Sequence, residues 1–278
     1  MLNLRPYTSN EFKRLYHGRG EKTYPFLTVD SIEDSILVEF YEEKDEKPFL
    51  EYLKKYIQNT HHKNIIVKRR YKNETFAFIG EIPEEIFAIE DGIKFKLNLF
   101  NQNIGYFGDI SPLRKYIENI SKDKTVLNLF AYTCGFSLFA RRGGAEKIVN
   151  IDMNKSVLKT GLINHQINNL ETKNISFLQH NALKSNYKKL SYDIIVIDPP
   201  SFQKGGFDIS KDYEKLIKKV KKYANENSYL IAALNSPKFD KTFLKKTVEK
   251  NSSFRFYKEI KPNLDYINST LKCMVFKI

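Results

Sequence analysis

The sequence has few cysteines and no long apolar run, and each absence excludes a class of protein. Cys134 and Cys273 are the only cysteines among 278 residues, too few for a disulfide framework and without the paired spacing of a zinc site. The longest apolar runs, such as residues 194–197, fall far short of the roughly 18 residues that a membrane span needs. The first twenty residues hold no apolar stretch of signal-peptide length. We therefore expect a cytoplasmic protein with no membrane contact and no structural metal.

The length and composition are those of a globular protein with a sizeable core. The chain has 278 residues, of which 41% are hydrophobic and 28% are charged. As a prior, this length corresponds to one large domain or two ordinary ones. The same composition leaves little room for long disordered segments.

The positive charge is confined to one part of the chain. Residues 1–100 carry 16 Lys and Arg against 17 Asp and Glu, a net charge of −1, whereas the remaining residues carry 30 against 16, a net charge of +14. A local basic excess favours a polyanionic partner such as a nucleic acid. The alternative is biased base composition in the genome, because 37 of the 46 basic residues are Lys. The charge alone leaves both interpretations open.

The first hundred residues read as a small α+β domain. Residues 24–29 and 35–40 have the composition of short strands. A helix follows, with Pro48 in its first turn and apolar residues at helical spacing from Phe49 to Ile57. Extended segments at residues 64–71 and 75–80 come next, and Asp91 and Gly92 predict a two-residue hairpin turn.

After residue 110 strands and helices alternate, the pattern of a parallel sheet covered on both faces. The predicted strands are residues 125–132, 147–153, 174–182, 192–200 and 228–235, with a helix at 211–223. Residues 254–260 and 271–278 are predicted to pair as an antiparallel hairpin at the sheet edge. We place the domain boundary near residue 100, so that residues 1–100 form the small domain and residues 101–278 form the α/β domain.

Two strand ends carry residues suited to binding a nucleoside. In an open α/β sheet, ligands bind at the carboxyl ends of the strands. Gly135 follows the first strand and permits a sharp turn, but one glycine stands where a dinucleotide fingerprint has three, which disfavours an NAD enzyme. Asp152 ends the second strand, where a carboxylate can accept both hydroxyls of a ribose. Alternatively, Asp152 caps the helix that follows it.

The fourth strand ends in Asp198, Pro199, Pro200, Ser201 and Phe202. Two consecutive prolines remove two backbone donors, so this rim can only accept hydrogen bonds, as an amino group on a base requires. The Phe202 ring can stack on such a base. The alternative is that the prolines only end a strand and Phe202 belongs to the core.

Together these segments resemble a known family. Residues 126–154, residues 193–206 and the upstream residues 103–114 are similar, in order and spacing, to class I S-adenosylmethionine-dependent RNA methyltransferases. The resemblance is to those related to the large-subunit ribosomal RNA cytosine C5 and guanine N7 enzymes. It implies an α/β fold, a Rossmann-like methyltransferase sheet preceded by a small amino-terminal α+β domain, with S-adenosylmethionine as cofactor. The separate amino-terminal RNA-binding module of some relatives has no room here, since the α+β domain begins near residue 24.

The resemblance also implies roles for individual residues. Asp152 would hold the ribose, Met153 would flank the adenine, and Asn181, followed by Ala182, would accept a hydrogen bond from the adenine amino group. The loop under the methionine moiety would consist of Phe130, Ala131, Tyr132, Thr133, Cys134 and Gly135.

The upstream segment contributes two further candidates by resemblance. Asp109 and Arg114 match that segment of the family, and Arg114 would pair with the cofactor carboxylate or with an RNA phosphate. Gly108 replaces a usual apolar residue, so the sequence departs from the family at that point.

The chemistry implied is transfer to nitrogen without a covalent intermediate. The cytosine C5 branch needs a cysteine nucleophile after the fifth strand, where this sequence has Asn235, Ser236 and Pro237. A base nitrogen can attack the sulfonium methyl directly, helped by alignment and exclusion of water. We assign base positioning to three catalytic-site residues: Asp198, Pro199 and Phe202.

The sequence therefore predicts a methyltransferase acting on RNA, with ribosomal RNA as the expected substrate. One rival is a methyltransferase of proteins or small molecules, which charge reversal at Lys218 and Lys219 would distinguish through the salt dependence of RNA affinity. Another rival is a non-catalytic RNA-binding or assembly factor. The oligomeric state is open, with a homodimer among the alternatives. His17, between Arg14 and Arg19, is interpreted as part of a phosphate-contacting loop or of a structured turn.

Overall fold

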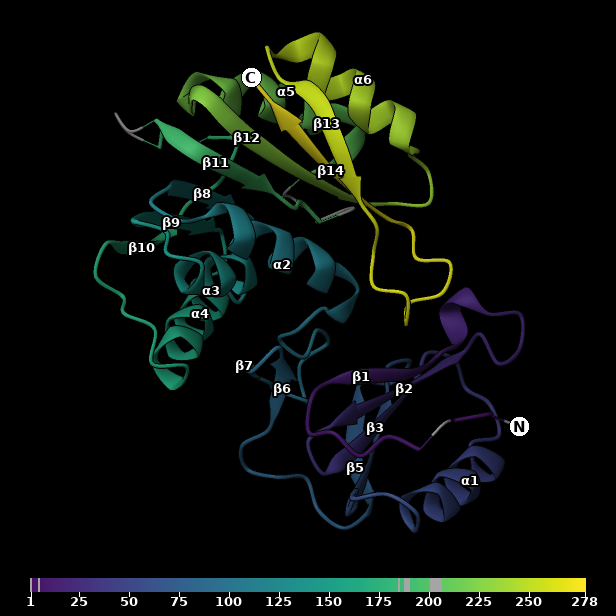
Figure 1. Cartoon of the computed structure of the whole chain (residues 1–278). Helices are drawn as coiled ribbons and strands as arrows, with labels where there is room; N and C mark the ends of the chain where they lie inside the picture. The colour runs from purple at the N-terminus through teal and green to yellow at the C-terminus, as the bar shows by residue number, and fades with distance from the viewer. Residues whose placement is uncertain (1, 5, 185, 188–190, 201–206) are drawn as a thin grey trace. The chain divides into compact units, whose positions relative to one another are not determined.

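The computed structural model describes residues 2–4, 6–184, 186–187, 191–200 and 207–278 (Figure 1). The chain forms two compact units. Unit 1 comprises Met1–Asp109 together with Asn263–Ser269, and unit 2 comprises Ile110–Pro262 together with Thr270–Ile278. Across the described ranges, no helix combines the length and apolar character needed to cross a membrane.

Unit 1 is built on a five-stranded sheet whose strands follow one another in chain order. The strands are β1 (Lys13–His17), β2 (Leu27–Ile32), β3 (Ser35–Phe40), β4 (Asn64–Arg69) and β5 (Glu74–Ile79). Neighbouring strands are antiparallel except β3 and β4, which are parallel and are joined through helix α1 (Lys47–Ile57). A 3-10 turn, η1 (Gly18–Gly20), follows β1, and a separate hairpin pairs β6 (Phe87–Glu90) with β7 (Ile93–Lys96).

The helix and the hairpin of unit 1 form where the sequence predicts them. Pro48 stands in the first turn of α1, and the helix buries Phe49 and Leu53 against the apolar side chains of β2, β3 and β4. Asp91 and Gly92 join β6 to β7 with φ angles of 50° and 76°. These are the left-handed conformations that a two-residue hairpin turn requires.

A distant segment of the chain completes unit 1. Asp265 pairs with Lys13 at 2.7 Å, and the Asn268 side chain donates to the Gly20 carbonyl at 2.6 Å. A Cβ built on Gly108 would lie 2.3 Å from the hydroxyl oxygen of Tyr266. This close approach explains the glycine at the position where the family has an apolar residue.

The division into units differs in two respects from the boundary expected near residue 100. The first unit continues to Asp109, and it includes residues 263–269, which connect two strands of the other unit. It also contains β1, eleven residues before the expected beginning of the domain at residue 24. Arg14 on β1 pairs with the buried Asp30 at 2.5 Å, which fixes this strand against β2.

Unit 2 is a seven-stranded sheet of order β10-β9-β8-β11-β12-β14-β13. The strands are β8 (Thr125–Leu129), β9 (Lys147–Asp152), β10 (Ile175–Gln179), β11 (Tyr192–Ile197), β12 (Ala224–Asn235), β13 (Arg255–Ile260) and β14 (Leu271–Lys277). The five strands from β10 to β12 in this order run parallel to one another. Strand β14 is antiparallel to both β12 and β13. The predicted parallel sheet and the predicted edge hairpin are therefore confirmed.

Helices cover both faces of this sheet (Figure 1). The helices are α2 (Ser111–Ile120), α3 (Gly135–Arg142), α4 (Lys155–Ile167), α5 (Ile209–Val220) and α6 (Lys241–Asn251), with η2 (Gly108–Ile110) before α2 and η3 (Lys221–Tyr223) after α5. Apolar residues of α2 and α3 pack on one face, and those of α5 and α6 pack on the other. The helix predicted at residues 211–223 begins at Ile209, because Asp208 caps it by accepting from the Ser210 N–H at 2.9 Å.

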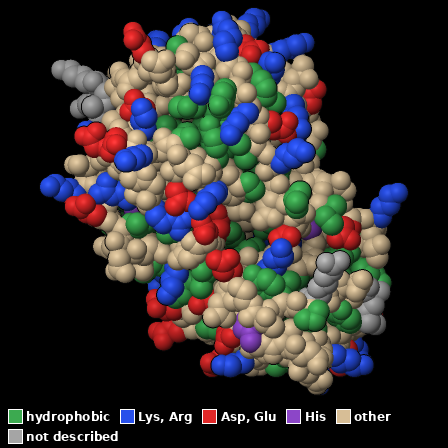
Figure 2. All heavy atoms as spheres, in the orientation of Figure 1, with side chains coloured by type: hydrophobic (Ala, Val, Ile, Leu, Met, Phe, Trp, Pro, Cys, Tyr) green, Lys and Arg blue, Asp and Glu red, His purple; other side chains and the backbone are tan. Residues whose placement is uncertain are grey.

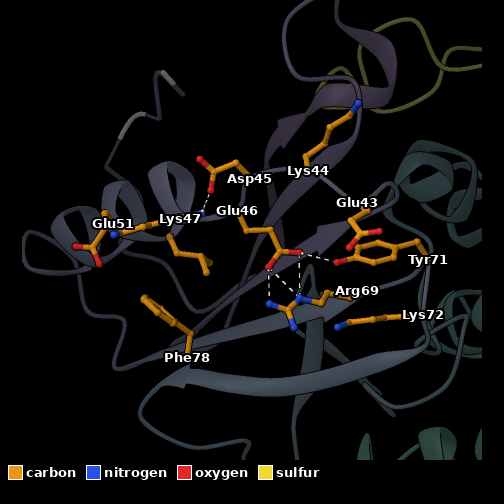
Figure 3. A pocket seen from close by; sticks show the side chains of 11 residues that line it. Glu43, Lys44, Asp45, Glu46, Lys47, Glu51, Arg69, Tyr71, Lys72 and Phe78 are labelled. Atoms are coloured by element: carbon orange, nitrogen blue, oxygen red, sulfur yellow. Dashed lines mark hydrogen bonds and ion pairs between the residues drawn. The ribbon is translucent and has the colours of Figure 1, made fainter.

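Unit 1 also contains a cavity of about 430 Å³ (Figure 3). Its charged lining residues are Glu43, Lys44, Asp45, Glu46, Lys47, Glu51, Arg69 and Lys72. The four acidic and four basic side chains balance, and Arg69 pairs with Glu46 at 2.8 Å while the Tyr71 hydroxyl donates to the same carboxylate. The lining of the cavity therefore has no net charge that would favour an anionic or a cationic ligand.

Candidate active site at the carboxyl edge of the sheet

The strand order of unit 2 creates a switch point between β8 and β11. These two strands are adjacent and parallel, but the chain continues from β8 toward β9 and β10 and from β11 toward β12 (Figure 1). The loops that follow Leu129 and Ile197 therefore leave the sheet in opposite directions. A crevice at the carboxyl ends of such strands is the usual ligand site of an open α/β sheet.

The loop after β8 has an unusual backbone. Phe130, Tyr132 and Cys134 have φ angles of 59°, 48° and 62°, in the left-handed region that non-glycine residues rarely adopt. Two backbone hydrogen bonds hold this form: the Ala131 N–H donates to the Ile151 carbonyl at 3.0 Å, and the Cys134 N–H donates to the Ala131 carbonyl at 2.8 Å. Strain of this kind persists where the surroundings over-determine it and is concentrated at functional sites.

The sharp turn predicted at Gly135 is displaced by one residue or more. Gly135 is the first residue of α3, and the left-handed conformations fall on three of the five residues before it, Phe130, Tyr132 and Cys134. A different glycine allows the close packing: a Cβ on Gly161 of α4 would lie 2.4 Å from the Cys134 sulfur. The Asn164 side chain, one turn further along α4, donates to the Thr133 carbonyl at 3.2 Å. Contacts with helix α4 therefore hold Thr133 and Cys134 of the loop in place.

A buried polar network, which the sequence analysis did not identify, lies beside this loop. The Asn128 side chain donates to Asn150 at 2.9 Å, and Asn150 donates to the Ser137 hydroxyl at 3.0 Å. That hydroxyl lies 3.0 Å from Nε2 of His165, and burial lowers the pKa of the imidazole. The network ties β8 and β9 to α3 and α4. Its members lie on four elements, so no local pattern in the sequence indicates it.

Asp152 at the end of β9 accepts two backbone hydrogen bonds and caps no helix. Its Oδ2 accepts from the Tyr132 N–H at 3.0 Å, and its Oδ1 accepts from the Asn154 N–H at 2.9 Å. The cap of α4 is Asn154, whose side chain accepts from the Ser156 N–H. The interpretation of Asp152 as a helix cap is therefore wrong. Each carboxylate oxygen keeps lone pairs for a further donor.

Met153 and Asn181 lie beside this carboxylate. The Met153 side chain is 43% exposed, which is high for a large apolar residue, and its sulfur is 3.5 Å from the Asn181 Nδ2. The Asn181 Oδ1 accepts from the N–H groups of Leu183 and Lys184, at 2.8 and 3.1 Å. These bonds use both of its lone pairs, so Asn181 presents a donor rather than the acceptor expected for the adenine amino group. Ala182, which follows, is buried.

The end of β11 supplies a second carboxylate. Asp198 is half-buried, Pro199 is buried and Pro200 is exposed. Burial and, second, the nearby Asp198 charge raise the pKa of the Tyr213 phenol, which donates to the Ala233 carbonyl at 3.1 Å. The stacking role proposed for Phe202 lies outside the described residues, as does Ser201.

An aromatic row that the sequence analysis did not identify runs along the same edge. The Phe207 ring lies 5.2 Å from that of Phe130 and 6.2 Å from that of Tyr213. Tyr213 is followed by Phe243 at 6.5 Å, and Phe243 by Phe239 at 4.4 Å. The row joins the loop after β8 to the segment after β12, so the carboxyl edge has an apolar floor.

Both cysteines are inaccessible. Cys134 and Cys273 are 0% and 1% exposed. Burial raises the pKa of the Cys134 thiol, and the Asp152 carboxylate adds to the effect. After β12, at the position of the missing nucleophile, Asn235 accepts from the Thr270 hydroxyl at 2.6 Å. A thiol with a raised pKa is a poor nucleophile.

The two upstream candidates lie in different units. Asp109 belongs to unit 1, where its carbonyl accepts from the Asn263 N–H at 2.9 Å. Arg114 lies on α2 in unit 2, is 3% exposed, and has its guanidinium carbon 6.0 Å from the Phe139 ring centroid. Such deep burial is unlike that of a surface contact to RNA.

Comparison with known proteins identifies the family. Residues 13–277, nearly the whole chain, match the family described as S-adenosylmethionine-dependent methyltransferase. The chain belongs to this family. The predicted family, the Rossmann-like sheet and the cofactor of the family, S-adenosylmethionine, are thereby confirmed.

Two curated methyltransferases are similar in sequence to part of this chain. The chain is 37% identical over 186 residues to ribosomal RNA large subunit methyltransferase K/L of Pseudoalteromonas translucida, covering 63% of this chain and 26% of that protein. It is 34% identical over 142 residues to ribosomal RNA large subunit methyltransferase I of Aeromonas hydrophila, covering 49% and 36%. The chain thus spans about a quarter to a third of the length of these methyltransferases.

Solved structures of methyltransferases match a larger share. A putative S-adenosylmethionine-dependent methyltransferase from Streptococcus mutans superposes with a TM-score of 0.86 at 26% identity, over 97% of this chain and 75% of that one. A putative methyltransferase complexed with SAH gives the same TM-score and identity, over 97% and 76%. The Methanocaldococcus jannaschii tRNA m1G37 methyltransferase has a TM-score of 0.65 at 16% identity, over 90% and 70%, which shows a shared fold.

The donor set of the methyltransferase site fits S-adenosylmethionine. The Asp152 carboxylate retains acceptor capacity for the two ribose hydroxyls. The exposed Met153 offers an apolar surface for the adenine, and the Asn181 Nδ2 can donate to a ring nitrogen. The strained loop after β8 lies against Asp152 through the Tyr132 N–H. These residues would hold the nucleoside on one side of the switch point and leave Asp198 on the other.

Proposed function

We propose that this methyltransferase transfers a methyl group from S-adenosylmethionine to a base nitrogen in RNA, with ribosomal RNA as the substrate. The observation that carries the proposal is the presence of two carboxylates at the carboxyl ends of β9 and β11, the strands on either side of β8. Asp152 is suited to the nucleoside of the cofactor, and Asp198 with Pro199 forms a rim that accepts hydrogen bonds. A base that presents an amino group matches that rim.

The absence of an accessible thiol at this edge supports a direct transfer. When bound, the cofactor supplies an electrophilic methyl group on a sulfonium sulfur. A base nitrogen attacks with its own lone pair, so the chain needs no nucleophile of its own. Asp198 and Pro199 orient the base, and the aromatic row from Phe130 to Phe239 limits water at the edge. Alignment and exclusion of water supply the catalysis.

The loop residues 130–135 and Arg114 would hold the methionine end of the cofactor in this proposal. The loop has a left-handed backbone at three positions and lies against Asp152, and the family resemblance assigns it to that moiety. Burial of Arg114 favours the cofactor carboxylate as its ligand over an RNA phosphate. Unit 1, with Asp109 at its end, would contribute further RNA contacts.

Charge and relatives both support RNA as the substrate. Unit 2 carries 30 Lys and Arg against 14 Asp and Glu, a net charge of +16, whereas unit 1 carries 16 against 19, a net charge of −3. The curated relatives named above are ribosomal RNA methyltransferases. A polyanion fits the unit that holds the site.

The decisive experiment is transfer of a radiolabelled methyl group to RNA from a strain that lacks the gene. We expect label in this RNA and none in RNA from the parent strain, where the site is already modified. Mass mapping of nucleosides then shows one missing methyl group in the deletion strain. Label in protein or in small molecules, with none in RNA, would contradict the proposal.

Two variants test the assignment of the base to Asp198 and Phe202. Asp198→Ala should lower single-turnover transfer on the order of a hundredfold, because misorientation of about 1 Å costs that much. Phe202→Ala should lose about 1 to 3 kcal/mol, the value of one base–aromatic contact. Cofactor affinity should change little in either. Ser191→Ala, at an exposed position just before β11, is the control. Wild-type rates in both variants would place the substrate pocket elsewhere, beginning with residues 235–239.

A third variant tests transfer without a cysteine nucleophile. The double variant Cys134→Ala, Cys273→Ala should retain substantial activity, because both thiols are buried. RNA containing 5-fluorocytosine should not become trapped on the protein, since trapping requires a covalent adduct. A stable protein–RNA adduct on a denaturing gel would restore a cytosine C5 mechanism.

A further inference from the structure

One face of the unit 2 sheet carries an aromatic and basic surface where β12, β13 and β14 lie side by side. The Tyr229 and Tyr257 rings lie 6.4 Å apart, and the Lys277 Nζ lies 4.7 Å from the first centroid and 3.9 Å from the second. Tyr229 and Lys277 are register partners on β12 and β14, so their side chains share a face. Tyr257 is 50% exposed. The Tyr257 ring is therefore available to a ligand, and the Tyr229 ring beside it is half-buried.

A β-bulge in the edge strand β13 extends this surface. The register shifts between Phe256 and Lys258, so that Tyr257 is the extra residue. A bulge places two successive side chains on one face, here Tyr257 and Lys258. The preceding Phe256 faces the other way, against Phe276 and beneath Lys245 of α6.

Helix α2 adds a third ring on the same face. The Lys258 Nζ lies 4.1 Å from the Tyr116 ring centroid. Two carboxylates of the neighbouring elements have cationic partners: Glu118 pairs with Arg142 at 2.5 Å, and Glu259 pairs with Lys241 at 2.5 Å. Lys258 and Lys277 place positive charge beside the rings. Figure 2 shows apolar and aromatic side chains with basic ones around them over β12 and β14.

We propose that Tyr116, Tyr229, Tyr257, Lys258 and Lys277 form a platform that binds an unpaired segment of the RNA substrate. The inference rests on the proposed function. Aromatic side chains exposed on a sheet face stack with splayed bases of any identity, and interleaved lysines contact phosphates. A duplex presents no base faces to such rings, so the platform selects single-stranded RNA.

The platform lies at the opposite end of the sheet from the candidate active site. Tyr229 and Asn235, at the carboxyl end of β12, are six residues apart on one strand, a separation of about 20 Å. An RNA strand with stacked bases at about 3.4 Å per nucleotide needs roughly six nucleotides to span it. The platform therefore binds a flanking segment and not the target base. A small molecule cannot reach both places.

An RNA-binding measurement on neighbouring residues of β13 tests the platform. With a fluorescent single-stranded RNA of about 12 nucleotides, within the site sizes of such surfaces, Tyr257→Ala should weaken binding about tenfold. Phe256→Ala is the matched control, since it removes an aromatic ring from the same strand on the other face, and it should leave the affinity unchanged. A fully paired RNA hairpin should show little difference among the three proteins. Equal affinity of wild type and Tyr257→Ala for the single strand would overturn the platform.

The lysines are tested through the salt dependence of the same binding. The double variant Lys258→Ala, Lys277→Ala should lower the slope of log affinity against log salt by about 1.4, the contribution of two phosphate contacts on a single strand. Lys215→Ala, Lys218→Ala makes the same change of charge on α5, on the other face of the sheet, and should leave the slope as in the wild type. An equal loss of slope in both double variants would overturn the assignment to this surface.

The failures of the two proposals are distinguishable. Wild-type protein that binds the single strand through Tyr257 but transfers no methyl group to RNA contradicts the proposed function alone. If the wild type methylates RNA, and Tyr257→Ala binds and methylates RNA equally well, only the platform is contradicted. Thermal unfolding of each variant separates a loss of contact from a loss of fold, and Tyr257 is exposed enough to be replaced without a cavity.

Discussion

At the residue scale, Asp152 has a structural task in addition to the ribose-binding task proposed for it. Its two oxygens hold the N–H groups of Tyr132 and Asn154 and so fix the loop after β8 relative to β9. The same oxygens are those proposed to accept the ribose hydroxyls. Hydrogen bonds to an ionised partner contribute about 1.5 to 3 kcal/mol. We therefore expect Asp152→Ala to weaken S-adenosylmethionine binding by about that amount in calorimetry, and Asp152→Asn to weaken it less.

The neighbouring cap provides the control for Asp152. Asn154→Ala removes the cap of α4, which costs about 1 kcal/mol of stability, but leaves the carboxylate in place. Its cofactor affinity should stay near that of the wild type. Equal affinity of wild type and Asp152→Ala would remove the ribose assignment and leave only the structural role of the carboxylate.

His62 makes the stability of unit 1 dependent on pH. It is buried, with Nε2 2.7 Å from the Ser31 hydroxyl and Nδ1 2.7 Å from the Thr60 hydroxyl. Burial, and second the nearby His61, lower its pKa to about 4. Because the unfolded chain binds the proton near pH 6.5, the stability is fully present above that pH and is lost as the pH falls toward 4.

We expect urea unfolding to show a loss of about 1 to 2 kcal/mol between pH 7 and pH 5 from this residue. His62→Gln should reduce the loss, since glutamine does not titrate. His17, whose burial beside Arg14 also lowers its pKa to about 4, contributes in the same direction. The exposed His180 is the control, and His180→Gln should leave the pH dependence unchanged. A wild-type stability that is constant over this range would contradict the assignment.

Some residues of the candidate site can be recognised from the sequence alone, and others cannot. Asp152 and Asp198 are visible because each ends an apolar strand, and the carboxyl ends of parallel strands meet at one edge. The left-handed backbone of Phe130 and Tyr132 is not visible, since neither residue type favours that conformation and the tertiary contacts impose it. The acceptor role expected for Asn181 failed for a similar reason: two backbone N–H groups occupy its oxygen.

At the element scale, helix α4 packs so closely against the loop after β8 that a change in the helix would displace the loop. Gly161 allows the helix to approach the Cys134 side chain, and a Cβ there would lie 2.4 Å from the sulfur and 2.9 Å from the Cys134 Cβ. Overpacking of a tight core contact costs about 1 to 3 kcal/mol. We expect Gly161→Ala to lower stability by about that amount and to weaken cofactor binding, because the displaced loop carries the Tyr132 N–H that contacts Asp152.

Two controls separate loop displacement from general destabilisation. Lys159→Ala changes an exposed position of the same helix and should affect neither stability nor cofactor binding. His62→Gln lowers stability in the other unit, and its cofactor affinity should remain normal. If Gly161→Ala binds the cofactor as tightly as the wild type, the loop does not depend on this contact.

The elements that the sequence predicts are those with strong apolar patterns. The core strands β8, β9 and β11 are nearly continuous apolar runs and were expected within a few residues of their bounds. By contrast, β1 is partly buried along its whole length and shows no alternation. Residues 263–269 join unit 1 through contacts with residues about 250 positions away, such as that of Asp265 with Lys13. A local pattern does not contain such a pairing.

At the scale of the whole molecule, charge is divided more sharply between the units than along the chain. Unit 2 has a net charge of +16 and unit 1 of −3. Single lysines are not equivalent, however. Lys219 donates to the Leu183 carbonyl at 2.7 Å and lies 4.8 Å from the Tyr187 ring centroid, and burial lowers its pKa. Charge reversal at Lys219 would break a structural contact, so a loss of RNA affinity in that variant would not by itself report a phosphate contact.

This division predicts different salt responses for the proposed RNA substrate and for S-adenosylmethionine. The KM for RNA should rise steeply with salt, because each phosphate contact contributes about 0.7 to 0.9 to the slope of log affinity against log salt. The Kd for S-adenosylmethionine should change little, since the contact proposed between Asp152 and the ribose consists of short-range hydrogen bonds that salt screens weakly. Steady-state kinetics and calorimetry over a series of salt concentrations measure both. A KM that is independent of salt would favour a small molecule over RNA, because a substrate without a phosphate chain releases no condensed counterions.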